Sequence, residues 1–437
     1  MADSTETTDP EAKKLLPDWR IHPLRDSVLG EMHSRPFHAL TTPARLLHFA
    51  FTHDVTQAIA DRRAFVDFCL RHGVVAPDAA TKHHYVELQD VAVRWEQHGE
   101  FTTFTYIVEG LQAASLEAAK ALTAPLIAEL PQTGPLLVSV ALSLEQDDGP
   151  VDLERLFDET SVVASNMSRE GALTATDFRL KLDGFVHILV RNKSLSLNRT
   201  GALTQRLLEI ETYRTLALLG LPEALRCGGQ IRKVEAGLNR ILGELNSADG
   251  GAADHKMLEE LTLLAAELEA DLAASSYRFG ASRAYDSLVQ QRLVAVGEQS
   301  WQDYSTFESF LARRMAPAMR TCQVTADRQS DLSQKLSRAA NLLRTRVDVA
   351  IERQNRDLLQ SMNDRTRLQL RLQQTVEGLS VAAISYYVVS LLGYVFKGVK
   401  ELGYGPDPSF SMAIAAPFVV LGVALIVRRI RRSHTDH

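Results

Sequence analysis

Histidine and carboxylate side chains near the N-terminus are the first candidates for chemistry. The chain contains 13 histidines, and most of them precede Gly99. These early histidines are His22, His33, His38, His48, His53, His72, His83, His84 and His98. Imidazole and carboxylate groups suit zinc and other divalent ions, so Glu31 with His33, and His83 with His84, could supply ligands. No fixed spacing such as H-E-x-x-H is present, so ordinary hydrogen-bonded or exposed histidines are favoured and metal binding stays open.

A second candidate surrounds a predicted hairpin turn at His98 and Gly99. Arg94, Trp95 and Glu96 precede this turn, and Glu100 and Phe101 follow it. Charges beside large aromatic side chains could form a ligand site, but a salt bridge between paired strands is the favoured interpretation. No Walker loop, G-x-G-x-x-G or G-x-S-x-G sequence is present. We therefore predict no catalytic residue, no cofactor and no enzymatic activity.

The elements that would position these residues form a mixed region over 18–192. Alternating apolar and polar residues predict strands, and apolar residues three or four apart predict helices. The strands are expected over 45–52, 85–96, 101–108, 135–144, 161–164, 173–182 and 184–190, and the helices over 54–71 and 115–130. Asp54 is expected to cap the first helix, with Gly73 just past its end. The order of these elements predicts an α/β or α+β domain with helices against a sheet.

The region over 193–317 has helical spacing of Leu, Ala, Ile and Val throughout. We predict helices over 200–219, 222–246, 254–275, 282–299 and 301–314, with a loop over 247–253. These helices would form a bundle that connects the α/β domain to the next segment.

One very long helix is predicted over 318–375, since no proline lies between Pro317 and Pro406. With the segment that follows, about 80 residues of continuous helix would reach roughly 120 Å. An apolar stripe runs along it, formed by Leu332, Leu336, Ala339, Leu343, Val347, Ile351, Leu358 and Met362. Either the chain's own bundle or the same helix of another subunit could cover this stripe.

Two apolar segments, 376–396 and 410–427, are each long enough to cross a bilayer, with a short linker over 397–409. Basic residues flank the two segments on one side: Arg365, Arg367, Arg371, Arg428, Arg429, Arg431 and Arg432. The linker carries Lys397, Lys400, Glu401 and Asp407. Because arginine-rich flanks stay in the cytoplasm, we predict that both termini, including the basic tail over 428–437, are cytoplasmic.

Small side chains line one face of the first segment. They are Gly378, Ala382, Ser385, Val389 and Gly393. Such a face lets two helices approach closely in lipid. It could pack on the second segment of the same chain, or it could form a subunit contact or pore wall in an oligomer. A continuous polar stripe is not evident in this segment, which counts against a conventional aqueous pore.

The composition excludes several classes of protein. A net charge of −6 argues against nucleic acid as a partner. Cys69, Cys227 and Cys322 stand far apart, so neither a cysteine-rich zinc module nor a disulfide framework is expected. Residues 1–17 are polar and acidic, which predicts a disordered tail and no signal peptide.

Several blocks together resemble a bacterial family of uncharacterised membrane-anchored proteins, a domain of unknown function. The blocks are HPLR (22–25), EMHSRPF (31–37), RWEQHGEF (94–101), QRLLEIETYR (205–214) with ALLGLP (217–222), the stretch 277–285, and QTVEGLSVAAISYY (374–387). The resemblance covers nearly the whole chain and implies membrane anchoring, but no activity.

The predicted order of elements also resembles CorA-type divalent-cation transporters, which are pentamers whose first span lines the pore. Their Gly-Met-Asn signature after the first span is absent, and KGVKELGYGP (397–406) stands there instead. Two lysines near an entrance would repel hydrated magnesium, which weakens any inference of magnesium selectivity.

The sequence thus predicts an α+β membrane protein. It would have an N-terminal α/β domain, a helical bundle with one very long helix, and a C-terminal two-span transmembrane hairpin in the bacterial inner membrane. The favoured function is a membrane-anchored scaffold or interaction protein with a large cytoplasmic domain and an unidentified protein partner. The alternative is an oligomeric, CorA-like ion channel or transporter with a divalent cation as its cargo. The exposed stripe and the small-residue face favour a homo-oligomer.

Overall fold

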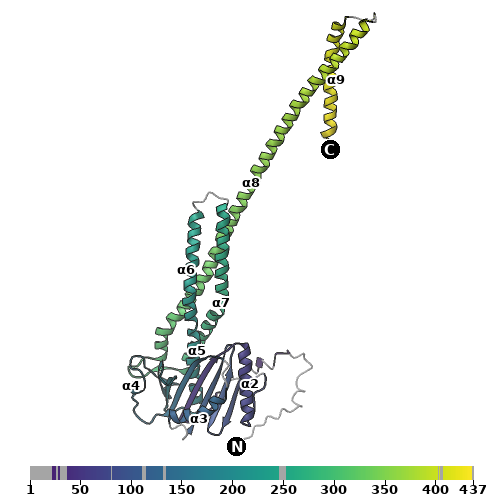
Figure 1. Cartoon of the computed structure of the whole chain (residues 1–437). Coiled ribbons are helices and arrows are strands. Elements are labelled where there is room, and N and C mark those ends of the chain that lie inside the picture. Colours follow the sequence, from purple (N-terminus) through teal and green to yellow (C-terminus); the bar gives the residue numbers. More distant parts are fainter. Residues whose placement is uncertain are drawn as a thin grey trace. The chain divides into compact units, whose positions relative to one another are not determined.

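The computed structural model describes residues 22–25, 28–29, 37–79, 81–110, 115–130, 134–245, 252–401, 403 and 407–435. The predicted tail over 1–17, Glu31, His33 and most of the predicted loop over 247–253 lie outside these residues. The elements, in chain order, are β1 (Ala44–Thr52), α2 (Val55–Arg71), β2 (His83–Leu88), β3 (Val91–Gln97), β4 (Phe101–Glu109), α3 (Leu116–Glu129), β5 (Leu136–Gln146), α4 (Leu153–Leu156), β6 (Val163–Met167), β7 (Ala172–Leu180), β8 (Val186–Asn192), α5 (Leu197–Leu218), α6 (Gly220–Leu245), α7 (Ala252–Val296), β9 (Gln299–Ser300), α8 (Phe307–Glu401) and α9 (Pro408–Thr435) (Figure 1).

Contacts divide the chain into two compact units. The first unit consists of Met1–Asn239 and Leu263–Leu336, and the second consists of Arg240–Thr262 and Ser337–His437. The first unit holds the whole sheet and both of its layers of helices. The second holds the paired C-terminal helices.

A single mixed sheet is the centre of the first unit. Its nine strands follow the order β2-β3-β4-β1-β5-β8-β7-β6-β9. All neighbours are antiparallel except β5 and β8. The predicted hairpin at His98 and Gly99 is confirmed as the β3–β4 connection. The predicted strand over 85–96 is wrong as one element, because a tight turn at Gln89, with φ of 43°, divides it into β2 and β3.

One face of the sheet is covered by α2 and α3. The predicted cap of α2 is confirmed, since the Asp54 carboxylate accepts a hydrogen bond of 2.8 Å from the Gln57 backbone N–H. Trp95 on β3 is fully buried and stacks on Phe65 of α2, with ring centroids 5.2 Å apart. Burial of such aromatic side chains is the main stabilising contribution of this layer.

The other face is covered by α5, the C-terminal part of α7 and the first turns of α8. Apolar side chains of these three helices join those of β1, β5 and β8 in one cluster. Polar residues of β1, β3 and β4 interrupt this apolar surface beneath α5, and they form the candidate site described below.

Two predicted breaks in the helices are wrong. The helices expected over 254–275 and 282–299 are one helix, α7, which continues through Gly280. The long helix expected to begin at 318 instead begins at Phe307 and continues through Pro317. A helical glycine costs about 1 kcal/mol and an interior proline about 3 kcal/mol. Buried neighbours on both sides of each breaker, such as Phe279 and Met315, offset these costs by packing in the first unit.

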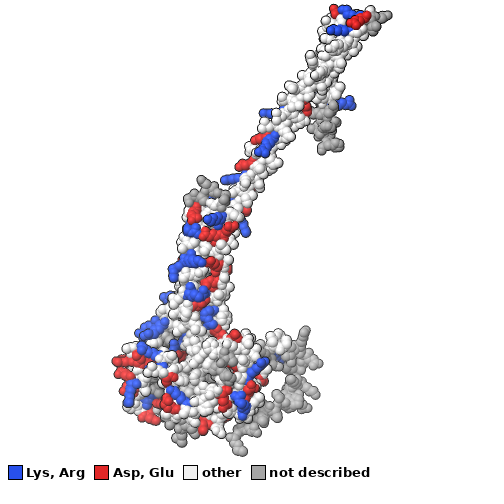
Figure 2. Space-filling view, in the orientation of Figure 1, with Lys and Arg blue, Asp and Glu red and all other residues white. Residues whose placement is uncertain are grey.

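In the second unit, α8 and α9 form an antiparallel pair. The helix α8 extends to Glu401, so the predicted linker over 397–409 is shorter than expected. Both helices are long and apolar enough to cross a membrane, and Figure 2 shows few charged side chains along their paired part. The apolar stripe of α8 is covered at Ala339 and Leu343, whereas Ile351, Leu358 and Met362 are each at least half exposed.

Candidate functional site

A buried polar layer lies between the sheet and α5. His48 of β1 is 3% exposed, and its two ring nitrogens contact two threonine hydroxyls. Nδ1 lies 2.8 Å from Thr105 Oγ1, and Nε2 lies 3.0 Å from Thr212 Oγ1. The Thr212 hydroxyl already donates its only hydrogen to the Leu208 carbonyl, at 2.8 Å. It must therefore accept from His48, which assigns the neutral tautomer with hydrogen on Nε2.

Electrostatics favour the same neutral form of His48. Burial, and then the positive charge of Arg94, lower the pKa of His48 to about 3. Its imidazole can therefore hold two strands and one helix together at neutral pH, but it cannot act there as a proton-donating acid.

Arg94 and Glu96 lie side by side on β3, and both are almost fully buried. The Arg94 Nε atom lies 3.6 Å from Glu96 Oε2, and Arg94 Nη1 donates a hydrogen bond of 2.9 Å to Gln205 Oε1 of α5. Burial alone would raise the pKa of Glu96, but the charge of Arg94 and the nearby histidines together outweigh burial, so this pKa lies below its ordinary value. The predicted salt bridge thus exists within one strand and not between strands.

The polar layer continues from α5 to α7. Gln205 Nε2 donates to Glu209 Oε1 at 3.1 Å, and Glu209 Oε2 accepts from Arg292 Nε of α7. Arg94, Gln205, Glu209 and Arg292 therefore form one hydrogen-bonded network across three elements. Such networks hold the elements that carry their members in place, although Arg94 Nε itself has no partner within hydrogen-bond distance among the described residues.

Glu100 makes a second contact between the hairpin and α7. Its carboxylate accepts from Arg278 Nη1 at 3.2 Å, from Arg278 Nη2, and from the Tyr277 hydroxyl at 3.2 Å. Burial, followed by the nearby Glu100 carboxylate, raises the pKa of Tyr277. Sequence reasoning singled out Glu100 but placed its partner in the hairpin, whereas the partner lies 178 positions along the chain.

The space enclosed by this layer is too small for a substrate. A cavity of about 20 Å³ is lined by residues that include His48, Arg94, Glu96 and Thr212. That volume admits about one water molecule. With opposite charges paired across its members, the layer is suited to holding α5 and α7 on the sheet.

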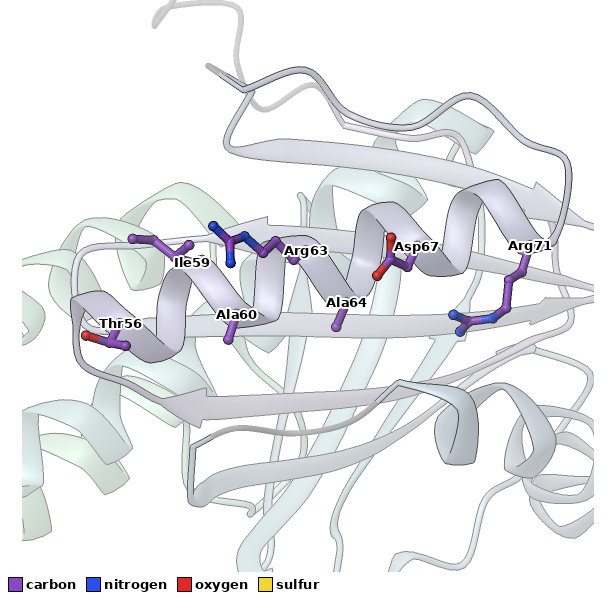
Figure 3. Close-up of a pocket in the computed structure, with 7 residues that line it drawn as sticks. All are labelled: Thr56, Ile59, Ala60, Arg63, Ala64, Asp67 and Arg71. Carbon is purple, nitrogen blue, oxygen red and sulfur yellow. The ribbon is translucent and has the colours of Figure 1, made fainter.

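An open groove follows the outer face of α2 (Figure 3). Its volume is about 590 Å³, and small side chains at Thr56, Ala60 and Ala64 recur at one-turn spacing along it. Arg63 and Asp67 add charges of both signs, and Ile59 is 49% exposed. The groove thus combines small and apolar side chains with charges of both signs on the face of α2 that points away from the sheet.

The described histidines near β2 have partners other than a metal ligand set. His84 Nε2 lies 2.7 Å from the Val75 carbonyl oxygen, while the His38 ring stacks on those of His83 and Tyr85. Within the described ranges, no three His, Cys, Asp or Glu side chains converge on a point that could hold a metal ion.

The predicted small-residue face is divided in the structure. Gly393 is buried, and a Cβ atom built on it would lie 2.5 Å from Met412 Sδ of α9. Ser385 is 4% exposed and Val389 is half-buried, whereas Gly378 and Ala382 are exposed. This face therefore contacts α9 only along its C-terminal half.

The predicted flanking charges lie at the two ends of the helix pair. Lys397 and Glu401 lie in the last turns of α8, and Lys400 Nζ is 3.7 Å from Asp407 Oδ1. Arg365, Arg367 and Arg371 are exposed on α8, as are Arg428 and Arg429 on α9, while Arg431 and Arg432 fall in the last turns of α9.

Sequence reasoning missed the α5 and α7 members of the polar layer. Gln205, Glu209 and Thr212 recur at helical spacing on a face that is otherwise apolar. That pattern was the available signal, because polar residues on the buried stripe of a helix need partners.

The start of α8 depends on one carboxylate. Glu298 accepts from the backbone N–H groups of Phe307, at 2.5 Å, and Glu308, at 3.0 Å, and from the Ser165 hydroxyl at 2.5 Å. It satisfies two of the free donors at the helix N-terminus and ties them to β6.

Replacing Glu298 with alanine should lower the free energy of unfolding by about 1–2 kcal/mol, because these donors lose their acceptor. Chemical denaturation of the purified protein measures this change. Glu352→Ala, at an exposed position of α8, is the matched control and should change stability by less than about 0.5 kcal/mol. Equal effects of the two substitutions would contradict the capping role.

Comparison with known families covers nearly the whole chain. The model of a family described as a protein of unknown function, DUF3422, matches residues 20–434. None of the curated proteins matches the chain. The resemblance to an uncharacterised family, stated from the six sequence blocks, is thereby confirmed.

Proposed function

This chain belongs to the DUF3422 family, whose function is not described, and we propose that it is a membrane-anchored interaction protein. In this proposal α8 and α9 anchor it in the bacterial inner membrane, and the unit that contains the sheet binds a protein partner on the cytoplasmic side. It is proposed to work as a homo-oligomer without catalysis or a cofactor.

The observation that carries this proposal is the exposed apolar surface of the helix pair. Leu379 is 74% exposed, Leu391 64%, Phe418 71% and Leu421 63%. A soluble protein rarely leaves so large an apolar surface in water. The 22 residues of Pro408–Arg429 span about 33 Å, which matches the thickness of a bilayer core.

The arginines support one orientation in the membrane. Because Gly393 lies beside Met412 in an antiparallel pair, the C-terminal end of α9 returns toward the Arg371 level of α8. Arg371, Arg428 and Arg429 therefore belong to the same end of the pair. The positive-inside rule would put this end, and both termini, in the cytoplasm.

The α2 groove is the proposed docking face for the partner. It combines exposed Ile59 with charges at Arg63 and Asp67 on a helix that is held rigidly against the sheet. An apolar anchor beside charges of both signs is typical of interfaces between proteins.

Two experiments test this proposal. Alkaline carbonate should leave the protein in the membrane fraction, and its release would contradict anchoring.

A photo-crosslinking amino acid at Ala64 should capture a discrete partner in cells, whereas one at exposed Glu154 of α4 should not. The Ala64 adduct should disappear with Ile59→Glu. A protein that stays in the membrane after carbonate treatment but gives no crosslinked adduct at Ala64 would contradict the interaction role.

The alternative is an oligomeric CorA-like ion channel. The observation that favours it is the exposed stripe of Ile351, Leu358 and Met362 on α8, which a neighbouring subunit could cover. Native mass of the detergent-solubilised protein discriminates between the two functions. A single pentameric species that conducts divalent cations in liposomes would favour the channel, whereas a monomer or dimer would exclude a central axis of five helices.

Gly393→Leu tests the close packing of the helix pair. The larger side chain must displace Met412, so we expect a loss of about 1–3 kcal/mol in stability and a lower midpoint of thermal unfolding in detergent. Gly378→Leu is the matched control, since nothing lies within 4 Å of a Cβ atom at that position. Equal thermal stability of the two variants would contradict the packing.

A further inference from the structure

The first predicted span, 376–396 of α8, has one side that α9 covers. Gly393 meets Met412 there, and Ser385 is 4% exposed. Some of the small residues that could have formed a subunit contact are therefore already packed against α9 of the same chain. A contact between subunits would have to use another side of the helix.

Hydroxyl groups follow a line along the uncovered side. Ser380 is exposed, Tyr387 is 68% exposed and Tyr394 is 74% exposed. These three residues are seven positions apart, and an α-helix drifts only about 20° over seven residues. At about 100° per residue, Ser385 lies roughly opposite this line.

Tyr387 is the member that needs a partner most. It lies roughly 14–16 Å along the helix from either end of the span, too far for its hydroxyl to reach water. A serine hydroxyl can bond to the carbonyl one turn earlier, but a tyrosine hydroxyl is too far from its own backbone to do so. A hydroxyl facing lipid chains without a partner is unfavourable.

We propose that the line of Ser380, Tyr387 and Tyr394 is a contact with the same line of a second copy of this chain. The proposal rests on the membrane anchoring proposed above. Two copies inserted in the same orientation place equal residues at equal depth. Each hydroxyl can both donate and accept, so the line is complementary to itself.

The spacing fits this occupant. A seven-residue repeat is the repeat of parallel helices that wind around each other. Gln373, seven positions before Ser380, is also exposed and extends the polar line to the cytoplasmic end of the span. Hydrogen bonds between side chains of facing helices are a main source of helix association in lipid.

Disulfide cross-linking of the full-length protein in native membranes tests the contact. Ser380→Cys and Tyr387→Cys should each give a covalent dimer on mild oxidation. Ala382→Cys is the matched control, because this small residue is exposed but lies well away from the line. We expect several-fold more dimer from the first two variants, at a yield that does not fall with expression level. The native Cys69, Cys227 and Cys322 are buried, and the wild-type protein sets the background.

The outcomes separate this contact from the anchoring on which it rests. Variants that resist carbonate extraction but form no more dimer than Ala382→Cys would overturn the contact alone. Release of the protein by carbonate would overturn the anchoring and the contact together. Tyr387→Phe keeps the ring and removes the hydroxyl, so it should shift the native mass toward smaller species, whereas an unchanged mass would contradict the role of the hydroxyl.

Discussion

Replacing Arg94 with methionine should lower the free energy of unfolding by about 3–5 kcal/mol, because Glu96 would remain buried without its cation. The two side chains are 7% and 8% exposed, and Arg94 also holds Gln205 of α5. The substitution keeps most of the side-chain volume, so the loss comes mainly from charge and hydrogen bonding. Denaturant unfolding at neutral pH measures it.

Two further variants make this prediction specific. Arg94→Met with Glu96→Gln removes both charges and should recover part of the loss, since a neutral pair needs no ionic partner. Lys233→Met breaks the pair with Glu267, in which the lysine side chain is 62% exposed, and should cost less than about 1 kcal/mol. A double variant as unstable as Arg94→Met alone would contradict the electrostatic explanation.

His48 should make the first unit sensitive to acid. The pKa of the folded residue is about 3, against 6.5 for an exposed histidine. Between these values the unfolded chain binds the extra proton and the folded chain does not. The contribution of His48 is therefore fully present above pH 6.5 and is lost as pH falls, by about 1.4 kcal/mol per pH unit. At pH 5 the loss should approach about 2 kcal/mol.

His48→Gln isolates this effect. A glutamine amide can accept from Thr105 and donate to Thr212, but it does not titrate. The stability difference between wild type and variant should shrink by about 2 kcal/mol from pH 7 to pH 5. His255→Gln, at a position where the side chain is 67% exposed, is the control and should leave the pH dependence unchanged. A difference that does not vary with pH would mean that His48 is not buried in its neutral form.

These two predictions bear on function through the position of the polar layer. The layer joins the sheet to α5 and, through Glu209 and Arg292, to α7. Loss of Arg94 or protonation of His48 should loosen helices that lie opposite the α2 groove. If the Arg94→Met variant still gives the crosslinked adduct at Ala64, the shape of the α2 groove depends only on the packing of α2 against the sheet.

Much of the architecture could be predicted from the sequence because it depends on local periodicity. A short apolar run gave β1 and strand alternation gave β4, each to within one residue at either end, and Asp54 identified the beginning of α2. Hydrophobic length alone identified the two helices that could span a membrane. Arg94, Glu96 and Glu100 also stood out, since charges beside large aromatic residues are unusual within a strand pair.

Only the tertiary structure decided which distant residues meet. Gln205 and Arg292 join the site because α5 and α7 pack on one face of the sheet, and no local pattern specifies that pairing. Because their neighbours are buried by packing, α7 continues through Gly280 and α8 continues through Pro317, where local preferences predicted breaks. Packing also places Gly393 of α8 against Met412 of α9, whereas Tyr387 is exposed on the other side of α8. The local preference against a glycine or a proline inside a helix is worth about 1–3 kcal/mol, and the burial of many side chains together outweighs it.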